Sequence, residues 1–252
     1  MTTTRTPPAQ DLGLYRFSGL DYTAAALYLA ALTGFTLAGN YLLGLIQNLG
    51  TSPAATSYAA NLIFYGVVGI FAVLAARRVL VRDTRVLATR PWFTLLMIPT
   101  AVIAMLVLTA IVVAVGGAPE TSANQAGIQA LMQQVPAWLI VPLLVLVGPF
   151  VEEYIFRHLL IGKLGRYLNV WLCCVLSVVL FAALHIVGQE AITLTALLPY
   201  LAMGVVLVAV YMWTGRNVVF SYLVHAAKNL LSVVLIYAIS PELMEQLQQV
   251  QG

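Results

Sequence analysis

The chain has 252 residues, of which 62% are hydrophobic and only 8% charged, and its mean hydropathy is +0.95. A soluble globular domain carries about 25% charged residues, so this composition excludes an ordinary water-soluble protein and indicates one that lies in a lipid bilayer. The net charge of +3 does not indicate nucleic-acid binding, because the arginines stand in short segments between apolar runs, where membrane topology accounts for them.

Seven apolar runs are long enough to cross the hydrocarbon core of a bilayer, which takes about 20 residues in a helix. They lie at residues 22–46, 58–76, 92–115, 137–160, 170–188, 193–213 and 218–238. The predicted fold is therefore an all-α, polytopic bundle of seven spanning helices. An eighth crossing or a re-entrant piece is the alternative around Pro142 and the Gly148-Pro149 pair.

Basic residues between the runs alternate between the two sides of this bundle. One side collects Arg5, Arg16, Arg77, Arg78, Arg82, Arg85, Arg90, Lys163, Arg166 and Arg216, and the segments on the other side contain no Lys or Arg. Because such residues collect on the cytoplasmic side, the N-terminus is predicted to be cytoplasmic and the C-terminus to lie outside. The expected location is a bacterial plasma membrane.

The chain divides into four parts by composition. They are a cytoplasmic tail at 1–21, helices and an outer loop without a motif at 22–136, the helical core expected to carry the chemistry at 137–238, and a polar tail at 239–252. The loop at 116–136 is predicted to be a plain polar loop, with a short interfacial helix as the alternative. In the last part, Ser240-Pro241-Glu242 has the pattern of a helix start.

Two adjacent acids and a cation interrupt the fourth apolar run. An ionised side chain at mid-bilayer costs about 2.5–3.5 kcal/mol, so Glu152, Glu153 and Arg157 each indicate a function. Four residues apart, Glu153 and Arg157 share a helical face and can pair, while Glu152 points about 100° away. Glu152 is therefore the predicted general base. A Glu–Arg pair that serves only to fold a buried helix is the alternative.

Two further apolar helices carry imidazoles. Phe181 and His185 share one face of the fifth helix, so the phenyl ring can pack beside the imidazole. His225 and Asn229 repeat the spacing in the seventh helix and place two donors for a developing oxyanion on one stripe. Hydrogen bonds to neighbouring helices are the structural alternative for these side chains. His158, near the cytoplasmic end of the fourth helix, is predicted to be interfacial and not catalytic.

The three pieces, in this order on successive hydrophobic helices, resemble the motifs of the CAAX-protease and bacteriocin-processing (CPBP) family of intramembrane proteases. They are Glu152-Glu153-x-x-x-Arg157, Phe181-x-x-x-His185 and His225-x-x-x-Asn229, and the match runs over about residues 145 to 232 with Gly148-Pro149 and Phe156. His158 departs from the family pattern, which has a small residue there, and Lys228 adds a cation beside Asn229.

The resemblance implies proteolysis inside the membrane. Residue by residue, it implies that Glu152 is the base and that His185 positions the water. It further implies that His225 and Asn229 stabilise the oxyanion, with Glu153 and Arg157 in support. The implied partners are the bilayer and a peptide or membrane-protein substrate.

The mechanism leaves one alternative and one geometric difficulty. Glu152, His185 and His225 could ligate Zn²⁺ with water in the fourth position, so a metal-dependent hydrolase stays beside the glutamate type. With straight helices and the bounds above, Glu152 and His185 stand about 15 Å apart in depth at 1.5 Å per residue. A bend at Pro149, tilt, or a fifth helix that begins beyond the membrane surface is therefore expected.

Two other classes of function compete with the protease. A non-catalytic membrane immunity or scaffold protein can share the same fold, because fold does not fix function. A proton-coupled transporter would also use buried Glu, His and Arg. The first three helices carry no counterpart of the polar groups in the second half, so the inverted repeats of many transporters are not evident.

Overall fold

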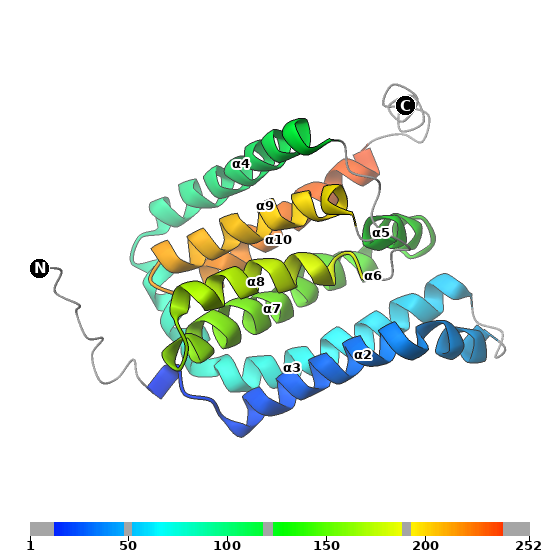
Figure 1. Cartoon of the computed structure of the whole chain (residues 1–252), viewed down its shortest axis with the longest axis horizontal. Coiled ribbons are helices and arrows are strands. Elements are labelled where there is room, and N and C mark those ends of the chain that lie inside the picture. Colours follow the sequence, from blue (N-terminus) through cyan, green and yellow to red (C-terminus); the bar gives the residue numbers. More distant parts are fainter. Residues whose placement is uncertain (1–12, 48–51, 118–122, 188–192, 239–252) are drawn as a thin grey trace, which may run out of the picture.

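The computed structural model describes residues 13–47, 52–117, 123–187 and 193–238, and every regular element in these ranges is a helix (Figure 1). The elements are α2 (Gly19–Gln47), α3 (Pro53–Ala88), α4 (Pro91–Gly116), α5 (Ala123–Gln134), α6 (Ala137–Val141), the π-helix η1 (Pro142–Val147), α7 (Gly148–Glu153), the π-helix η2 (Tyr154–Lys163), the 3₁₀-helix η3 (Leu164–Arg166), α8 (Val170–Leu184), α9 (Leu194–Trp213) and α10 (Val218–Ala238). The prediction of an all-α bundle is confirmed.

Each of the seven predicted runs corresponds to one helix. Five helices in the described ranges are long and apolar enough to cross a membrane, namely Pro53–Ala88, Pro91–Gly116, Ala137–Arg166, Leu194–Trp213 and Val218–Ala238. The 29-residue α2 takes the place of the first run and the 15-residue α8 that of the fifth. The protein is therefore a multi-pass membrane protein, as its composition indicates.

Helix α3 is longer than the apolar run that predicts it. It begins at Pro53, where the hydroxyl of Ser52 accepts from the Ala55 N–H at 3.1 Å, and continues to Ala88. Most of the arginines assigned to the following loop therefore lie on its last turns. Hydropathy marks the edge of the lipid, whereas the helix ends where Arg90 precedes Pro91 and takes an extended φ of −140°.

The fourth span is one composite helix from α6 to η3. Pro142 and Pro149 have no N–H to donate, so the α-helical ladder cannot continue through them, and the chain widens into π turns. In one of these turns the Gly148 N–H donates to the Leu143 carbonyl. The interruptions are absorbed within a single crossing, and the alternative of an eighth crossing here does not hold.

The composite helix also removes the expected depth mismatch between Glu152 and His185. It runs on to Arg166 instead of ending near residue 160, and a short turn leads into α8 at Val170. Glu152 and His185 then stand at nearly the same number of residues from this turn. In two antiparallel helices with a rise of about 1.5 Å per residue, that places them level.

A continuous apolar core joins the helices of both halves. Its buried members come from α2, α3, α4, the composite helix, α8, α9 and α10, and include Tyr28, Val68, Met105, Val151, Phe181, Leu207 and Val224. The described part of the segment predicted as a plain loop forms α5, so the short-helix alternative holds there. The predicted helix start at Ser240 lies outside the described residues.

Polar side chains join the first two described helices to the rest at the arginine-bearing end. The Asp21 carboxylate accepts from Lys163 Nζ and from the Tyr154 hydroxyl, both at 2.6 Å. The Asp83 carboxylate accepts from the Val218 N–H at 2.7 Å. His158 is fully buried, with the rings of Tyr15 and Tyr154 beside it, and its depth near the membrane interface stays a prediction.

Candidate active site

Glu153 lies fully buried in α7 and uses both carboxylate oxygens. Oε1 is 3.0 Å from Nδ1 of His225, and Oε2 is 3.3 Å from Nε of Arg157 and accepts a short hydrogen bond from the Ser221 hydroxyl. The ion pair predicted from the spacing of Glu153 and Arg157 is present. Both oxygens of the Glu153 carboxylate therefore have partners, and two of these partners, Ser221 and His225, belong to α10.

Arg157 is fully buried as well and lies against Phe181. Its guanidinium carbon is 4.5 Å from the centre of the phenyl ring, within the range of a cation–π contact. The phenyl ring in turn contacts the imidazole of His185 at 4.5 Å between centroids. Arg157 thus balances the charge of Glu153 and supports the helix that carries His185.

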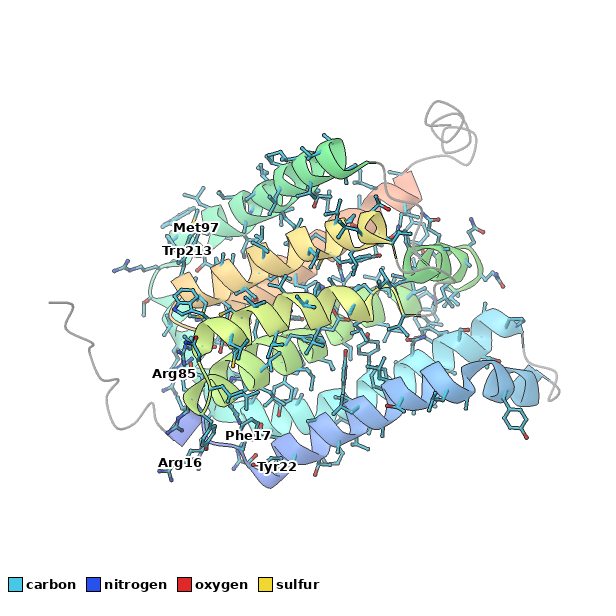
Figure 2. The ribbon with its side chains drawn as sticks, in the orientation of Figure 1. Arg16, Phe17, Tyr22, Arg85, Met97 and Trp213 are labelled. Atoms are coloured by element: carbon cyan, nitrogen blue, oxygen red, sulfur yellow. The ribbon has the colours of Figure 1, made fainter. Side chains whose placement is uncertain are left out.

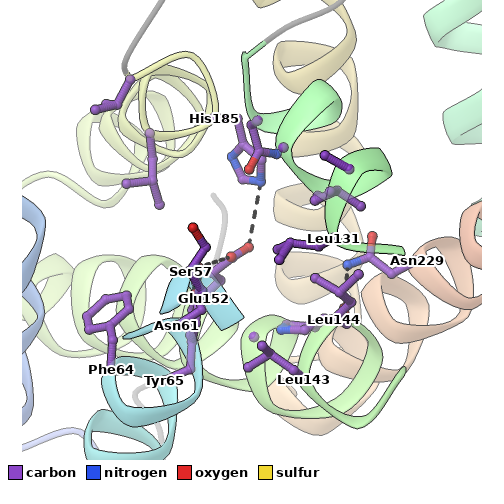
Figure 3. A pocket seen from close by; sticks show the side chains of 18 of the residues that line it. Ser57, Asn61, Phe64, Tyr65, Leu131, Leu143, Leu144, Glu152, His185 and Asn229 are labelled. Atoms are coloured by element: carbon purple, nitrogen blue, oxygen red, sulfur yellow. Dashed lines mark hydrogen bonds and ion pairs between the residues drawn. The ribbon is translucent and has the colours of Figure 1, made fainter. Parts of the chain in front are cut away.

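Glu152 faces in a different direction and is 7% exposed. Its Oε1 accepts from the Tyr65 hydroxyl at 3.0 Å. Its Oε2 lies 3.7 Å from Nε2 of His225. The same oxygen lies 3.9 Å from Nε2 of His185 (Figure 3). Both separations are too long for direct hydrogen bonds. One carboxylate oxygen and two imidazole nitrogens therefore face one another from three helices.

His185 stands at the C-terminal end of α8. Its Nδ1 is 2.8 Å from the carbonyl oxygen of Phe181, and its ring stacks on Tyr200 with 4.7 Å between centroids. A carbonyl only accepts hydrogen bonds, so Nδ1 carries the proton. The lone pair of neutral His185 is then on Nε2, the atom that faces Glu152.

His225 has the same kind of arrangement in α10. Because a carboxylate only accepts, the Nδ1 of His225 donates to Glu153, and Nε2 faces Glu152. The ring of Phe181 meets the imidazole edge-on at 5.8 Å between centroids. Hydrogen bond and ring contact together fix the orientation of His225.

Asn229 lies one turn farther along α10 and supplies a hydrogen-bond donor that the composite helix lacks. Its Nδ2 donates to the Leu144 carbonyl at 3.0 Å. That carbonyl has lost both helical donors, because the Gly148 N–H goes to Leu143 and Pro149 has no N–H. The amide nitrogen has two hydrogens, so one is left to donate elsewhere. The interface hydrogen bond and a role in chemistry are thus compatible.

A cavity of about 550 Å³ borders Glu152, His185 and Asn229. Its wall is mostly apolar, and its remaining lining comes from α2, α3, α5, η1, the start of α7 and the end of α8, with Tyr28, Ser57, Asn61, Phe64, Tyr65, Leu131, Gln134 and Leu143 among its members. Figure 3 shows Glu152 and His185 pointing toward each other beside this space. Lys228, next to Asn229, is partly buried and does not line the cavity.

The three residues considered as zinc ligands do not fit that role as they stand. Ligand atoms at about 2.0–2.1 Å from a tetrahedral Zn²⁺ lie about 3.4 Å apart, whereas Glu152 is 3.7 and 3.9 Å from the two imidazoles. Among the residues that the structure describes, no group of three His, Cys, Asp or Glu has the spacing of a metal site.

Two site residues escaped the sequence analysis. Ser221 stands four residues before His225, so extending the stripe of His225 and Asn229 backwards by one turn would have found it. Tyr65 comes from α3, 87 positions before Glu152, and no local pattern marks it among the aromatic residues of that helix. The structure brings all six predicted site residues to the same region of the bundle.

Comparison with known proteins agrees with the motifs. The family model described as type II CAAX prenyl endopeptidase Rce1-like matches residues 134–231. This stretch contains all three polar motifs and ends two residues after Asn229. No curated protein and no solved structure matches the chain significantly.

Proposed function

We propose, from the premise that residues 134–231 are a type II CAAX prenyl endopeptidase Rce1-like region, that this protein is an intramembrane endopeptidase of the glutamate type. One observation carries the proposal, namely that Oε2 of Glu152 faces Nε2 of both His185 and His225 beside the cavity. The substrate is a peptide or a segment of a membrane protein, and the expected location is a bacterial plasma membrane.

In the proposed reaction, Glu152 and His185 hold the attacking water. Both side chains present an acceptor to the water, so each accepts one hydrogen bond from it. A lone pair of the water oxygen is then left to attack the peptide carbonyl carbon. As the new C–O bond forms, a proton passes from the water to Oε2 of Glu152. The Tyr65 hydroxyl holds Oε1, so the carboxylate cannot turn away.

The carbonyl oxygen becomes an oxyanion and needs donors. In this reaction His225 carries a proton on each ring nitrogen from the start and keeps both, so that Nδ1–H donates to Glu153 and Nε2–H donates to the oxyanion, and the second N–H of Asn229 is the other donor. Collapse of the intermediate breaks the C–N bond, and Glu152 returns its proton to the leaving nitrogen. Glu153 and Arg157 position His225 and do not touch the substrate.

The test is the substitution Glu152→Gln, which keeps the size of the side chain and removes its basicity. General acid–base groups contribute about 10²–10⁴-fold, so cleavage should fall by at least about 100-fold. Proteins that accumulate uncut in cells with the Glu152→Gln variant identify the substrate, and cleavage of that substrate by purified protein gives the rate. Glu120→Gln, outside the three motifs, is the matched control.

Retention of cleavage by Glu152→Gln at the rate of the control would refute the proposal. It would favour the scaffold alternative if the cellular effect of the protein were also unchanged.

The same purified protein shows whether cleavage requires a metal. A glutamate-held water gives cleavage that persists in chelator, whereas loss in chelator and recovery with Zn²⁺ would establish the metal-dependent type.

A further inference from the structure

The cavity lies toward one end of the bundle. Its lining includes Ser57 and Asn61 near the start of α3, several residues of α5, and Leu184 to Val187 at the end of α8. Figure 1 shows that α5 and these helix ends lie together, at the end opposite the first turns of α2. The cavity therefore leads from Glu152 toward the end that α5 partly covers.

The basic residues lie at the opposite end. Figure 2 labels Arg16 and Arg85 there, and the same end holds the last turns of α3, η3 and the turn between α9 and α10. These elements carry Arg77, Arg78, Arg82, Arg166 and Arg216, and Lys163 at the end of η2 lies directly before η3. By the rule that basic segments stay inside, this is the predicted cytoplasmic end, so the cavity leads to the outer side.

Between Glu152 and the cytoplasmic end, the bundle is closed by packed side chains. Tyr154, Arg157 and His158 follow Glu152 along the composite helix, and each has 0% of its surface exposed. Below them Lys163 is 2% exposed and forms its ion pair with Asp21 across to α2. Toward the other end, the described residues leave the cavity beside Glu152 instead of such a layer.

We propose that substrate reaches the site from the non-cytoplasmic side, through the cavity beneath α5. The inference rests on the proposed proteolytic function and adds its sidedness and substrate class. The substrate would be an extended segment of a secreted or membrane protein that is exposed on the outer face.

The chemistry of the wall fits such a segment. Most of the lining is apolar and suits apolar side chains, while Ser57, Asn61, Asn124 and Gln134 are polar and can bond the backbone of a bound strand. An extended strand carries a full set of N–H and C=O groups that must find partners once it leaves water. The polar groups at the α5 end meet this need along the way to Glu152.

Cysteine labelling in intact cells tests the direction of access. The background replaces the buried Cys173 and Cys174 by alanine, and single cysteines are then placed at Ser57 and Asn124 in the cavity wall. Leu168→Cys, in the 47% exposed turn before α8 at the basic end, is the control. A membrane-impermeant maleimide should label the two cavity positions in intact cells and Leu168→Cys only after the membrane is opened.

Labelling of the cavity positions only in opened cells, or in neither condition, would overturn the proposal. A second measurement follows the substrate itself. Bulky labelling of Ser57→Cys on intact cells should lower cleavage at least tenfold and leave the Leu168→Cys protein unaffected, and full cleavage by labelled Ser57→Cys would overturn the route. If the protein were not a protease, no variant would cleave, yet the labelling pattern would still decide the side of the opening.

Discussion

Adjacent glutamates in α7 have different tasks because their neighbours differ. Glu153 forms an ion pair with Arg157 and accepts hydrogen bonds from His225 and Ser221, so its charge is balanced and its position is fixed. Glu152 has one neutral donor, Tyr65, and an oxygen directed at the two imidazoles. In the proposed reaction, Glu152 is therefore the carboxylate that takes the proton, and Glu153 is the one that positions His225.

Replacing Arg157 with methionine should destabilise the protein strongly. The variant leaves the Glu153 carboxylate buried without its cation, and loss of one partner of a buried pair costs about 3–5 kcal/mol. Unfolding in detergent would measure the change. Adding Glu153→Gln to Arg157→Met should recover part of the loss, and a double variant as unstable as the sum of the two singles would contradict the role of the pair.

Removing the hydroxyl of Tyr65 should slow cleavage without affecting the fold. Tyr65→Phe keeps the ring and its packing on Phe64 but takes away the donor to Glu152, and a hydrogen bond to a charged group contributes about 1.5–3 kcal/mol. We expect kcat to fall at least about tenfold, with KM nearly unchanged, and the pH profile to shift. Tyr41→Phe, which removes a hydroxyl at a 70% exposed position of α2, is the control.

Equal rates for Tyr65→Phe and the control would show that Glu152 does not need this donor.

At the residue scale, regular spacing predicted the contacts within one helix, such as Glu153 with Arg157 and Phe181 with His185. Tyr65 could not be predicted in this way, because its position opposite Glu152 is set by how α3 packs on the composite helix.

The composite helix shows why the element bounds were harder to predict than the elements themselves. The end assigned near residue 160 follows from polarity around Gly162 and Lys163, but the helix continues because Lys163 is paired inside the bundle with Asp21. A buried ion pair lets a helix carry a charge past the point where hydropathy falls. The predicted depth mismatch between Glu152 and His185 came from this one error.

The π turn before α7 makes a prediction about Asn229. Its amide serves the Leu144 carbonyl because Pro149 has no N–H, so Pro149→Ala would offer a backbone donor in its place. Asn229→Leu alone leaves the part-buried Leu144 carbonyl without this donor and should cost about 1 kcal/mol of stability, the net contribution of one hydrogen bond. In the Pro149→Ala background the same change should cost about 1 kcal/mol less, the energy of one hydrogen bond.

A double-mutant cycle on purified protein measures this coupling. Additive effects of Pro149→Ala and Asn229→Leu would show that the amide does not compensate for the proline. Cleavage gives a separate readout, because restored stability with lost activity in the double variant would assign the second N–H of Asn229 to the reaction.

At the scale of the whole molecule, residues 134–231, which the family model matches, do not include every residue of the candidate site. Residues 134–231 supply the glutamates, both histidines and Asn229, but Tyr65 and the cavity residues Ser57 and Asn61 come from α3. The first helices also help to close the arginine-bearing end through Asp21. These helices carry no recognisable motif because they contribute scattered residues of the cavity wall, such as Ser57 and Asn61, and one hydrogen-bond donor, Tyr65.

The two halves should therefore depend on each other for activity. A fragment of residues 134–252 lacks Tyr65 and one wall of the cavity, so we expect it to show no cleavage even where it inserts into the membrane. Co-expression with residues 1–133 should restore cleavage, since the core between α3 and the composite helix is apolar and can form between separate chains. A Tyr65→Phe substitution in the first fragment should lower the restored rate about as much as in the intact protein. Full activity of the second fragment alone would show that the family region is sufficient and that α3 has no part in the site.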